Sequence, residues 1–385
     1  MSFAIIWYIT LTTGSGLMTT LIILCSFAPQ FAISFFSGVW ADKYNRKKLI
    51  IIADSGRALA TLALIIYMMA GHESIAVLLF IAAIRSVATG VQMPAVNAII
   101  PQIVPQNKLI KVNGFNGSIQ SLVNLAAPAV AGAVLFYGEI QYIMMIDVIS
   151  TVIGISILLL ISIPKHKRAL EAVAAGYFAD FKDGLKYSKN HPFLKPLFIT
   201  YAFFTVLFVP AAFLSVLLVT QVFGANYLYL TVNEMSYFIG TLIGGLIIGV
   251  WGGFKNRVKT LIVGLFAFGA LSLGFGLTQT FWIYLVLMAL VGLATPFTYS
   301  PIMSLIQEKV DPDKQGRVFS LLQILFTSLM PFGMLFFGPM ADIVPVQTLV
   351  VYCGIGIVLL SIAVAFNKNF YRQGLSEVKT ETKSS

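Results

Sequence analysis

Residues 38–48 read GVWADKYNRKK, a short charged stretch between two long apolar ones. The 41 residues before Asp42 contain no charged side chain, and five charged residues then fall within residues 42–48. Apolar sequence resumes at Leu49. This pattern is typical of a loop between two membrane-spanning helices, because charged side chains are costly in the hydrocarbon layer of a bilayer.

The composition of the whole chain also indicates a membrane protein. Of its 385 residues, 58% are hydrophobic and 10% are charged, and the mean hydropathy is +0.90. A soluble globular protein has about 25% charged residues, so this chain has too few to cover a surface that faces water. Both cysteines lie inside apolar runs, which argues against a disulfide framework.

A helix needs about 20 apolar residues to cross about 30 Å of hydrocarbon. Residues 1–11 would rise only about 16 Å as a helix, half of a bilayer. We expect them to be the back half of a first span whose beginning is absent from this chain; the alternative is a short re-entrant or interfacial segment. Eleven full spans are predicted, at residues 17–41, 49–70, 75–100, 116–137, 142–163, 194–220, 231–252, 260–279, 281–303, 318–340 and 345–366.

The positive charges predict how the spans are oriented. If every span crosses, all Lys and Arg outside the spans lie on one side of the membrane, and the loops on the other side contain neither. Basic loops are cytoplasmic as a rule, so we place these segments and the C-terminus in the cytoplasm. The net charge of +10 then reflects sidedness and attraction to anionic lipids, and nucleic acid is not an expected partner.

The longest hydrophilic segment, residues 164–193, divides the spans into two sets of six. In this count, and in the span numbers below, the incomplete span at residues 1–11 is the first. The alternatives for the structure of the hydrophilic segment are an amphipathic helix on the membrane surface and a plain connection. We predict an N-terminal helical bundle over residues 1–163, a cytoplasmic linker over 164–193, a C-terminal bundle over 194–366 and a cytoplasmic tail over 367–385.

The charged stretch occurs twice. A shift of 211 residues places GVWADKYNRKK on GVWGGFKNRVK at residues 249–259, with six of eleven positions identical. Prolines farther along the chain match in order at similar shifts, so the chain reads as a duplicated six-helix unit. Internal repeats that enclose a site at the bilayer midplane are typical of alternating-access transporters.

Gly38, Asp42, Lys43, Arg46 and Lys47 resemble the signature loop of the major facilitator superfamily, in which an aspartate follows a glycine by four residues and basic residues come next. With the twelve-span layout and the repeat, the resemblance covers the whole chain. The stretches ADKYNRKKLIIIAD, PAVNAIIPQIVP and GRVFSLL resemble macrolide-efflux-type drug exporters. The resemblance implies an all-α polytopic membrane protein with two pseudo-symmetric six-helix bundles, acting as a monomer in a bacterial cytoplasmic membrane.

The resemblance further implies that this loop, the gating loop, holds the two bundles together on the cytoplasmic side. Asp42 would accept hydrogen bonds from the free N–H groups that begin the eleventh span, near residues 317–320, worth about 1 kcal/mol. The basic residues of the loop would orient Asp42 and contact lipid phosphates. The alternative is a positively charged anchor with no part in gating. In the second copy Gly253 replaces the aspartate, so this carboxylate occurs once.

Ionisable side chains inside spans are costly and functional by default. Asp54 and Arg57 are three residues apart and can pair across one helical turn, and Arg85 resembles the superfamily's fourth-span arginine, which is linked to proton coupling. We expect proton exchange at Asp54, Asp147 or Glu234. The alternatives are a purely structural Asp54–Arg57 pair and, for Glu234, a hydrated carboxylate at the outer interface.

Aromatic side chains predict a cavity for a lipophilic substrate. The candidates come from the seventh and tenth spans; the alternative is that they only face lipid or pack in the bundle. They are Tyr201, Phe204, Phe208, Phe297 and Tyr299.

The fifth span contains a run of small residues around a proline, in which exporters of the superfamily resemble one another. The alternative is simple close packing of helices. The residues concerned are Gly114, Ala127, Pro128 and Gly132.

We therefore predict an antiporter that exports a lipophilic, drug-like compound such as a macrolide and so confers antibiotic resistance. The chain has no Gly-Lys step and thus no phosphate-binding loop; we expect no enzymatic activity, cofactor or metal, and transport driven by a proton gradient. Two alternatives stay open: a carrier of a metabolite or siderophore with the same fold, and a degenerate membrane protein that transports nothing.

Overall fold

The computed structural model describes residues 1–105, 108–161 and 191–375. Most of the predicted linker and the last part of the predicted tail fall outside these residues. Within them, eleven helical stretches are long and apolar enough to cross a membrane, which confirms the eleven predicted spans. Helices suit this role because every backbone N–H and C=O away from the ends is satisfied within the helix, where lipid offers no partner.

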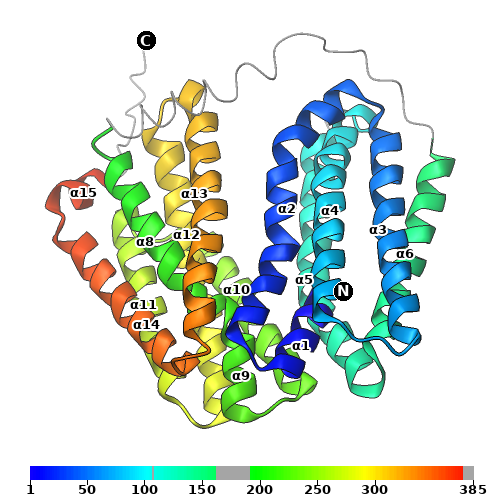
Figure 1. Cartoon of the computed structure of the whole chain (residues 1–385). Helices are drawn as coiled ribbons and strands as arrows, with labels where there is room; N and C mark the ends of the chain where they lie inside the picture. Colours follow the sequence, from blue (N-terminus) through cyan, green and yellow to red (C-terminus); the bar gives the residue numbers. More distant parts are fainter. Residues whose placement is uncertain (106–107, 162–190, 376–385) are drawn as a thin grey trace. The chain divides into compact units, whose positions relative to one another are not determined.

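The helices are labelled in Figure 1. In chain order they are α1 (Ser2–Thr13), α2 (Gly16–Lys43), α3 (Arg46–Met69), α4 (Ile75–Ile103), α5 (Leu109–Tyr137), α6 (Ile140–Leu160), α8 (Leu194–Phe213), α9 (Ser215–Phe223), α10 (Tyr227–Trp251), α11 (Arg257–Leu277), α12 (Phe281–Lys309), α13 (Pro312–Met340), α14 (Val346–Phe366) and α15 (Lys368–Gln373).

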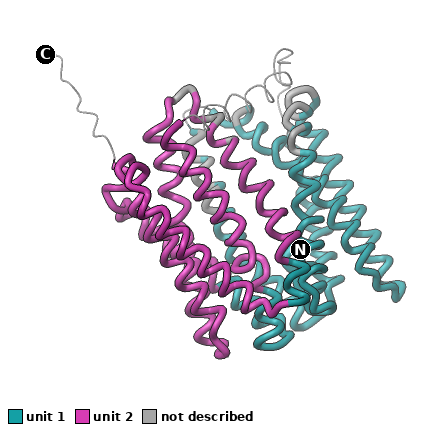
Figure 2. The backbone as a smooth tube through the Cα atoms, turned by 60° about the vertical axis from the view of Figure 1, so that its left-hand side comes forward, with its two compact units in different colours: residues 1–176, 216–235, 338–343 teal, residues 177–215, 236–337, 344–385 magenta. Residues whose placement is uncertain are grey.

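By its internal contacts the chain divides into two compact units (Figure 2). Unit 1 comprises Met1–Gly176, Val216–Met235 and Gly338–Ile343, and unit 2 comprises the rest. Unit 1 thus combines α1 to α6 with two short segments from the second half of the sequence.

In unit 1, α3 packs against both α4 and α6, and α2 packs against α4 (Figure 1). Gly90 allows the close approach of α4 to α2, because a Cβ at this position would collide with Ile33 and the Gln30 carbonyl. Ser86 Oγ also accepts a hydrogen bond from the Gln30 N–H at 2.9 Å. Because α4 and α6 both pack against α3, the α3 side chains that face these two helices are shielded from the lipid.

In unit 2, α11 packs against α12 and α14, and glycines also bring α10 close to α12. A Cβ at Gly240 or Gly244 would collide with the α12 backbone at Ala289 or Leu293. Gly245 lies on the same helix with nothing within 4 Å of where its Cβ would stand. Among these α10 glycines, close packing therefore requires Gly240 and Gly244 but not Gly245.

The span predicted at residues 194–220 consists of two helices. α8 ends at Phe213 and α9 begins at Ser215. Pro210 has no N–H and removes one backbone hydrogen bond near the end of α8. Ser215 Oγ then donates to the Ala212 carbonyl at 3.1 Å. At this break the chain passes from unit 2 to unit 1.

Candidate functional site

Four of the five predicted intramembrane charges form one cluster inside unit 1, the charge cluster. Asp54 and Arg57 lie on α3, Arg85 lies on α4 and Asp147 lies on α6. Arg57 Nη2 is 3.2 Å from Asp54 Oδ1, and Arg85 Nη1 is 2.8 Å from Asp147 Oδ2. These side chains are 13% to 22% exposed. Two arginines and two aspartates balance in charge, which lowers the cost of holding them at this depth.

Two buried threonines join the two ion pairs into one network. Thr61 accepts a hydrogen bond from Arg85 Nη1 and donates to the Arg57 carbonyl at 2.9 Å. Thr151 accepts from Arg57 Nη2 at 3.3 Å and donates to the Asp147 carbonyl at 2.7 Å. Each threonine follows a charged residue of the cluster by four positions. Because each arginine also contacts the helix that carries the other pair, a change at one ion pair reaches the second.

Asp54 has the longer ion pair of the two carboxylates and a second partner. Its second oxygen accepts a hydrogen bond from Gln92 Nε2 of α4 at 3.2 Å, and its ion pair is longer than that of Asp147. The Nε of its partner Arg57 is buried and makes no hydrogen bond within the described part of the chain. Arg57 therefore has one unused N–H donor, whereas Arg85 and Asp147 form the closer contact.

Glu234 lies apart from this cluster, on α10. It makes no hydrogen bond or ion pair with any residue that the structure describes. Spacing along the sequence could pair only Asp54 with Arg57. The packing of the helices in unit 1 brings Arg85 and Asp147 into the same cluster, but not Glu234. Thr61, Thr151 and Gln92 were not predicted from the sequence.

The predicted cavity residues form an aromatic group inside unit 2, with one exception. The ring centroids of Tyr201 and Tyr299 are 6.3 Å apart. Phe204 and Phe208 each pack against Phe268 of α11, at 5.4 Å in both cases. The fifth candidate, Phe297, instead packs against Trp251 at 6.2 Å. Phe204 is 7% exposed, so it has the surroundings of a core residue.

Tyr201 differs from the other members of this group in its polar atom. The residue is 2% exposed, and its hydroxyl lies next to the side chains of Tyr299 and Thr205 without forming a hydrogen bond of good geometry to a described residue. A buried hydroxyl without a partner costs about 1 to 3 kcal/mol. A buried polar group without a hydrogen bond needs an explanation in a native protein. One explanation is that the group binds a ligand.

The small-residue run on α5 brings this helix against α10. A Cβ at Gly132 would collide with the hydroxyl of Thr231, and Pro128 is buried four residues earlier. Ala127 is half-buried, and the surroundings of Gly114 lie outside the described part of the structure. At Gly132 the run therefore serves close packing within unit 1.

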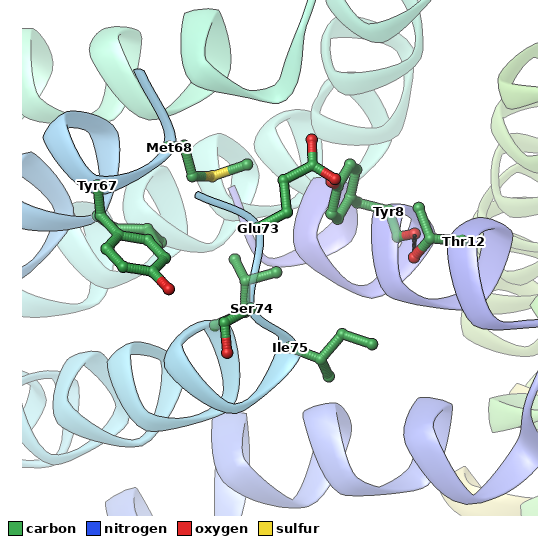
Figure 3. Close-up of a pocket in the computed structure, with 9 residues that line it drawn as sticks. Tyr8, Thr12, Tyr67, Met68, Glu73, Ser74 and Ile75 are labelled. Atoms are coloured by element: carbon green, nitrogen blue, oxygen red, sulfur yellow. Dashed lines mark hydrogen bonds between the residues drawn. The ribbon is translucent and has the colours of Figure 1, made fainter. Parts of the chain in front are cut away.

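Two cavities lie near the helix ends. The one in unit 1 has a volume of about 160 Å³, and Figure 3 shows Glu73 beside the ring of Tyr8 there. The one in unit 2 has a volume of about 250 Å³ and includes Arg257. Sites for drug-sized ligands measure about 300 to 1,000 Å³. Both cavities are too small for such a compound, and none of the predicted cavity residues lines either of them.

The family model described as Major Facilitator Superfamily matches residues 1–333. The chain belongs to the major facilitator superfamily. It is thus a multi-pass integral membrane transporter of small molecules, and not an enzyme.

Members of this superfamily that resemble the chain include a macrolide efflux protein and a staphyloferrin A transporter. The macrolide efflux protein A of Streptococcus pyogenes is 29% identical over 361 residues, which cover 93% of this chain and 89% of that protein. The staphyloferrin A transporter of Staphylococcus aureus is 22% identical over 340 residues, covering 88% of this chain and 84% of that protein.

Solved structures of the superfamily share the fold at low sequence identity. The xylose transporter XylE from E. coli, in an inward open conformation, has a TM-score of 0.67 and 12% identity, covering 95% of this chain and 92% of its own. A bacterial homologue of the human lysosomal transporter Spinster has a TM-score of 0.65 and 16% identity, covering 97% of this chain and 94% of its own.

The superfamily's signature loop is described in part. Gly38, Asp42 and Lys43 belong to the last turns of α2, but the surroundings of their side chains lie outside the described residues, so gating by Asp42 stays a prediction. Arg46 Nη1 donates to the Ala98 carbonyl of α4 at 2.6 Å. The described basic residues of the loop thus make contacts inside unit 1.

Lys47 acts at the end of α6. Its Nζ donates to the carbonyls of Leu159 and Ile161, at 2.9 and 2.8 Å. A cation is favourable there because the last carbonyls of a helix have no partner within it. Arg46 and Lys47 therefore tie the beginning of α3 to both helices that complete the charge cluster.

The second copy of the loop explains the missing carboxylate. Gly253, at the position that matches Asp42, has a φ of +77°, a left-handed conformation that favours glycine. Asn256 begins α11 by accepting from the Val258 N–H at 3.0 Å, as Asn45 does for Lys48 at the beginning of α3. The asparagine cap is thus common to both copies. The backbone differs at the matching position, because Asp42 lies in a helix and Gly253 does not.

Proposed function

We propose that this transporter exports a lipophilic, drug-like compound such as a macrolide in exchange for protons, by alternating access. The charge cluster carries the proposal, since ionisable groups at this depth are rare without a functional role. The likeness to macrolide efflux protein A along most of both chains supports the substrate class and the direction. We place the basic loops and the C-terminus in the cytoplasm by the distribution of Lys and Arg.

In the proposed cycle Asp54 is the proton-exchanging residue. Protonation removes the negative charge that faces Arg57, and the guanidinium then moves toward Thr151, which it already contacts at 3.3 Å. Thr151 also donates to the carbonyl of Asp147, so the shift of Arg57 changes the packing of α3 against α6. The proton gradient supplies the free energy, without a cofactor.

The substrate is proposed to bind next to Tyr201. The aromatic rings of Tyr299 and Phe208 suit an apolar molecule, and the Tyr201 hydroxyl supplies one polar contact. One hydrogen bond within apolar surroundings fits a lipophilic compound better than a highly charged one.

A siderophore is the second candidate substrate, because the staphyloferrin A transporter is also a relative. The described aromatic group contains no cation that would bind an anionic siderophore. We therefore rank this candidate below a lipophilic compound.

The proposal is tested by the accumulation of a radiolabelled macrolide in bacterial cells that lack their own exporters. Cells that express the chain should hold about a tenth of the compound found in empty-vector cells, and a protonophore should abolish the difference. The Asp54→Asn variant at equal abundance serves as the matched control. Equal accumulation with and without the chain, for macrolides and for ferric siderophores alike, contradicts both candidates.

Replacing Tyr201 by phenylalanine should raise stability and weaken substrate binding together. The substitution removes a buried hydroxyl that forms no hydrogen bond of good geometry with its described neighbours, so the free energy of unfolding should rise by about 1 kcal/mol. The apparent Kd for the macrolide should rise about tenfold, because a substrate hydrogen bond is lost. Thermal unfolding in detergent and equilibrium binding measure the two effects.

The matched control for that experiment is Tyr284→Phe, on α12 of the same unit, whose ring is also fully buried and stacks on Phe281. This variant should leave the Kd unchanged. A Tyr201→Phe protein that is more stable but binds the macrolide normally would show that its hydroxyl does not contact the substrate.

A further inference from the structure

The N-terminus of α2 is capped by a carboxylate that lies more than 320 residues away along the chain. Asp342 Oδ1 accepts from the Gly16 N–H at 2.6 Å. Its Oδ2 accepts from the Leu17 N–H at 3.1 Å and from Ser15 Oγ at 3.0 Å. The third free N–H, of Met18, donates to Ser15 Oγ at 3.3 Å. The first N–H groups of α2 therefore depend on Asp342, and a carboxylate is favoured at this end of a helix.

The backbones around this cap touch one another. A Cβ at Gly16 would collide with the Gly338 carbonyl and would lie 2.6 Å from the Ala341 Cβ. A Cβ at Gly338 would collide with the Thr20 hydroxyl in turn. Thr20 is 1% exposed and its hydroxyl has no hydrogen-bond partner in the described structure. The contact is thus buried at Thr20, while Asp342 itself lies at the exposed edge, and two glycines make the close approach possible.

A second contact of the same kind lies within unit 1. Gly132 of α5 packs against Thr231 near the beginning of α10, and again a Cβ would collide. Residues 216–235 and 338–343 come from the second half of the sequence, yet they pack with the first half, as the shared colour in Figure 2 shows. Both contacts lie at the helix ends opposite the basic loops. On the proposed orientation, the two halves of the chain meet here on the outer side.

We propose that Asp342 is a gating residue that holds the outer side of the transporter closed, and that it works against Asp42. Each carboxylate stands at the end of one of two helices: Asp42 in the last turn of α2, and Asp342 two residues after α13. Asp342 caps the beginning of α2. Asp42 is predicted to cap the beginning of α13, which lies at Pro312; the N–H groups near residues 317–320, which were expected from the sequence to bind Asp42, lie inside that helix. The two caps then stabilise opposite states of the cycle. This inference rests on the proposed alternating access, but not on the identity of the substrate.

The test measures how accessible one buried position is from outside the cell. In the full chain, with Cys25 and Cys353 replaced by serine, Thr20→Cys places a thiol of nearly the same size in the closed contact. A membrane-impermeant maleimide is added to whole cells, and the labelling rate reports the fraction of molecules whose outer side is open. Neither substrate nor proton gradient is required, so the result is independent of whether a macrolide is the cargo.

We expect Asp342→Asn to raise the labelling rate of this thiol about tenfold, because the cap loses its charge and one of its strong acceptors. Asp42→Asn should lower the rate, and the double variant should return close to the parent. Glu139→Gln is the matched control: this exposed carboxylate stands at the beginning of α6 without capping it, so its loss should change nothing.

Two outcomes overturn the proposal. One is an Asp342→Asn protein of normal abundance whose labelling equals that of the parent. The other is a rise in labelling for Asp42→Asn as well as for Asp342→Asn, since that would indicate general loosening of the fold and not two opposed caps. Opposite shifts in labelling together with absent macrolide export would support the gating role of Asp342 while removing the proposed substrate.

Discussion

Export by an Arg85→Met variant should fall about a hundredfold below that of the parent chain. Arg85 is the ion-pair partner of Asp147 at 2.8 Å and also donates to Thr61. Removing the cation leaves a carboxylate unpaired inside a membrane span, which costs about 3 to 5 kcal/mol of stability when one partner of a buried pair is lost. The melting temperature in detergent and the export rate per molecule should therefore both fall.

A double variant separates the structural from the functional part of this effect. Arg85→Met with Asp147→Leu replaces the pair by apolar side chains, which is often neutral for stability. We expect the melting temperature to return close to that of the parent while export stays absent, because the link between the two ion pairs is gone. Recovery of export in the double variant would mean that the Arg85–Asp147 pair is only structural.

The second large effect is expected at Asp54. An Asp54→Asn chain keeps an acceptor for Gln92, and Arg57 keeps its contact with Thr151, so the fold should persist with a smaller loss of stability than in Arg85→Met. Export against a concentration gradient should nevertheless stop, since an amide exchanges no proton. Downhill exchange of macrolide across the membrane should continue.

The matched control for Asp54 is Glu234→Gln, which removes a carboxylate from α10 outside the cluster. Its effect on coupled export should be small. If Glu234→Gln uncouples transport and Asp54→Asn does not, the proton-exchanging residue has been assigned to the wrong carboxylate.

The spans were predictable from the sequence because the lipid imposes a simple rule: about 20 apolar residues between charged or turn-forming ones. The break between α8 and α9 was not, since it involves both Pro210 and Ser215, whose hydroxyl donates to the Ala212 carbonyl at the end of α8. Spacing along one helix likewise predicted the Asp54–Arg57 pair. The Arg85–Asp147 pair needed the packing of α4 and α6 against α3, which no local pattern encodes.

The structure of the gating loop was likewise predictable from the sequence only in part. Repetition of GVWADKYNRKK as GVWGGFKNRVK identified the loop, and the shared asparagine turned out to begin a helix in each copy. The reason why the second copy has a glycine in place of the aspartate is a backbone angle, φ +77° at Gly253, which the residue type alone suggests only weakly. Asp342 was missed because its partners at Gly16 and Leu17 are remote in sequence, and an exposed aspartate after a helix is unremarkable by itself.

The most direct test of proton-coupled export uses the purified full chain in proteoliposomes that enclose a pH-sensitive dye. We expect that adding a macrolide to one side moves protons in the opposite direction, that an imposed pH gradient drives macrolide uphill, and that Asp54→Asn abolishes both while still binding the compound. Macrolide movement that is indifferent to the pH gradient, or proton movement that persists in Asp54→Asn, would contradict the coupling proposed for the charge cluster.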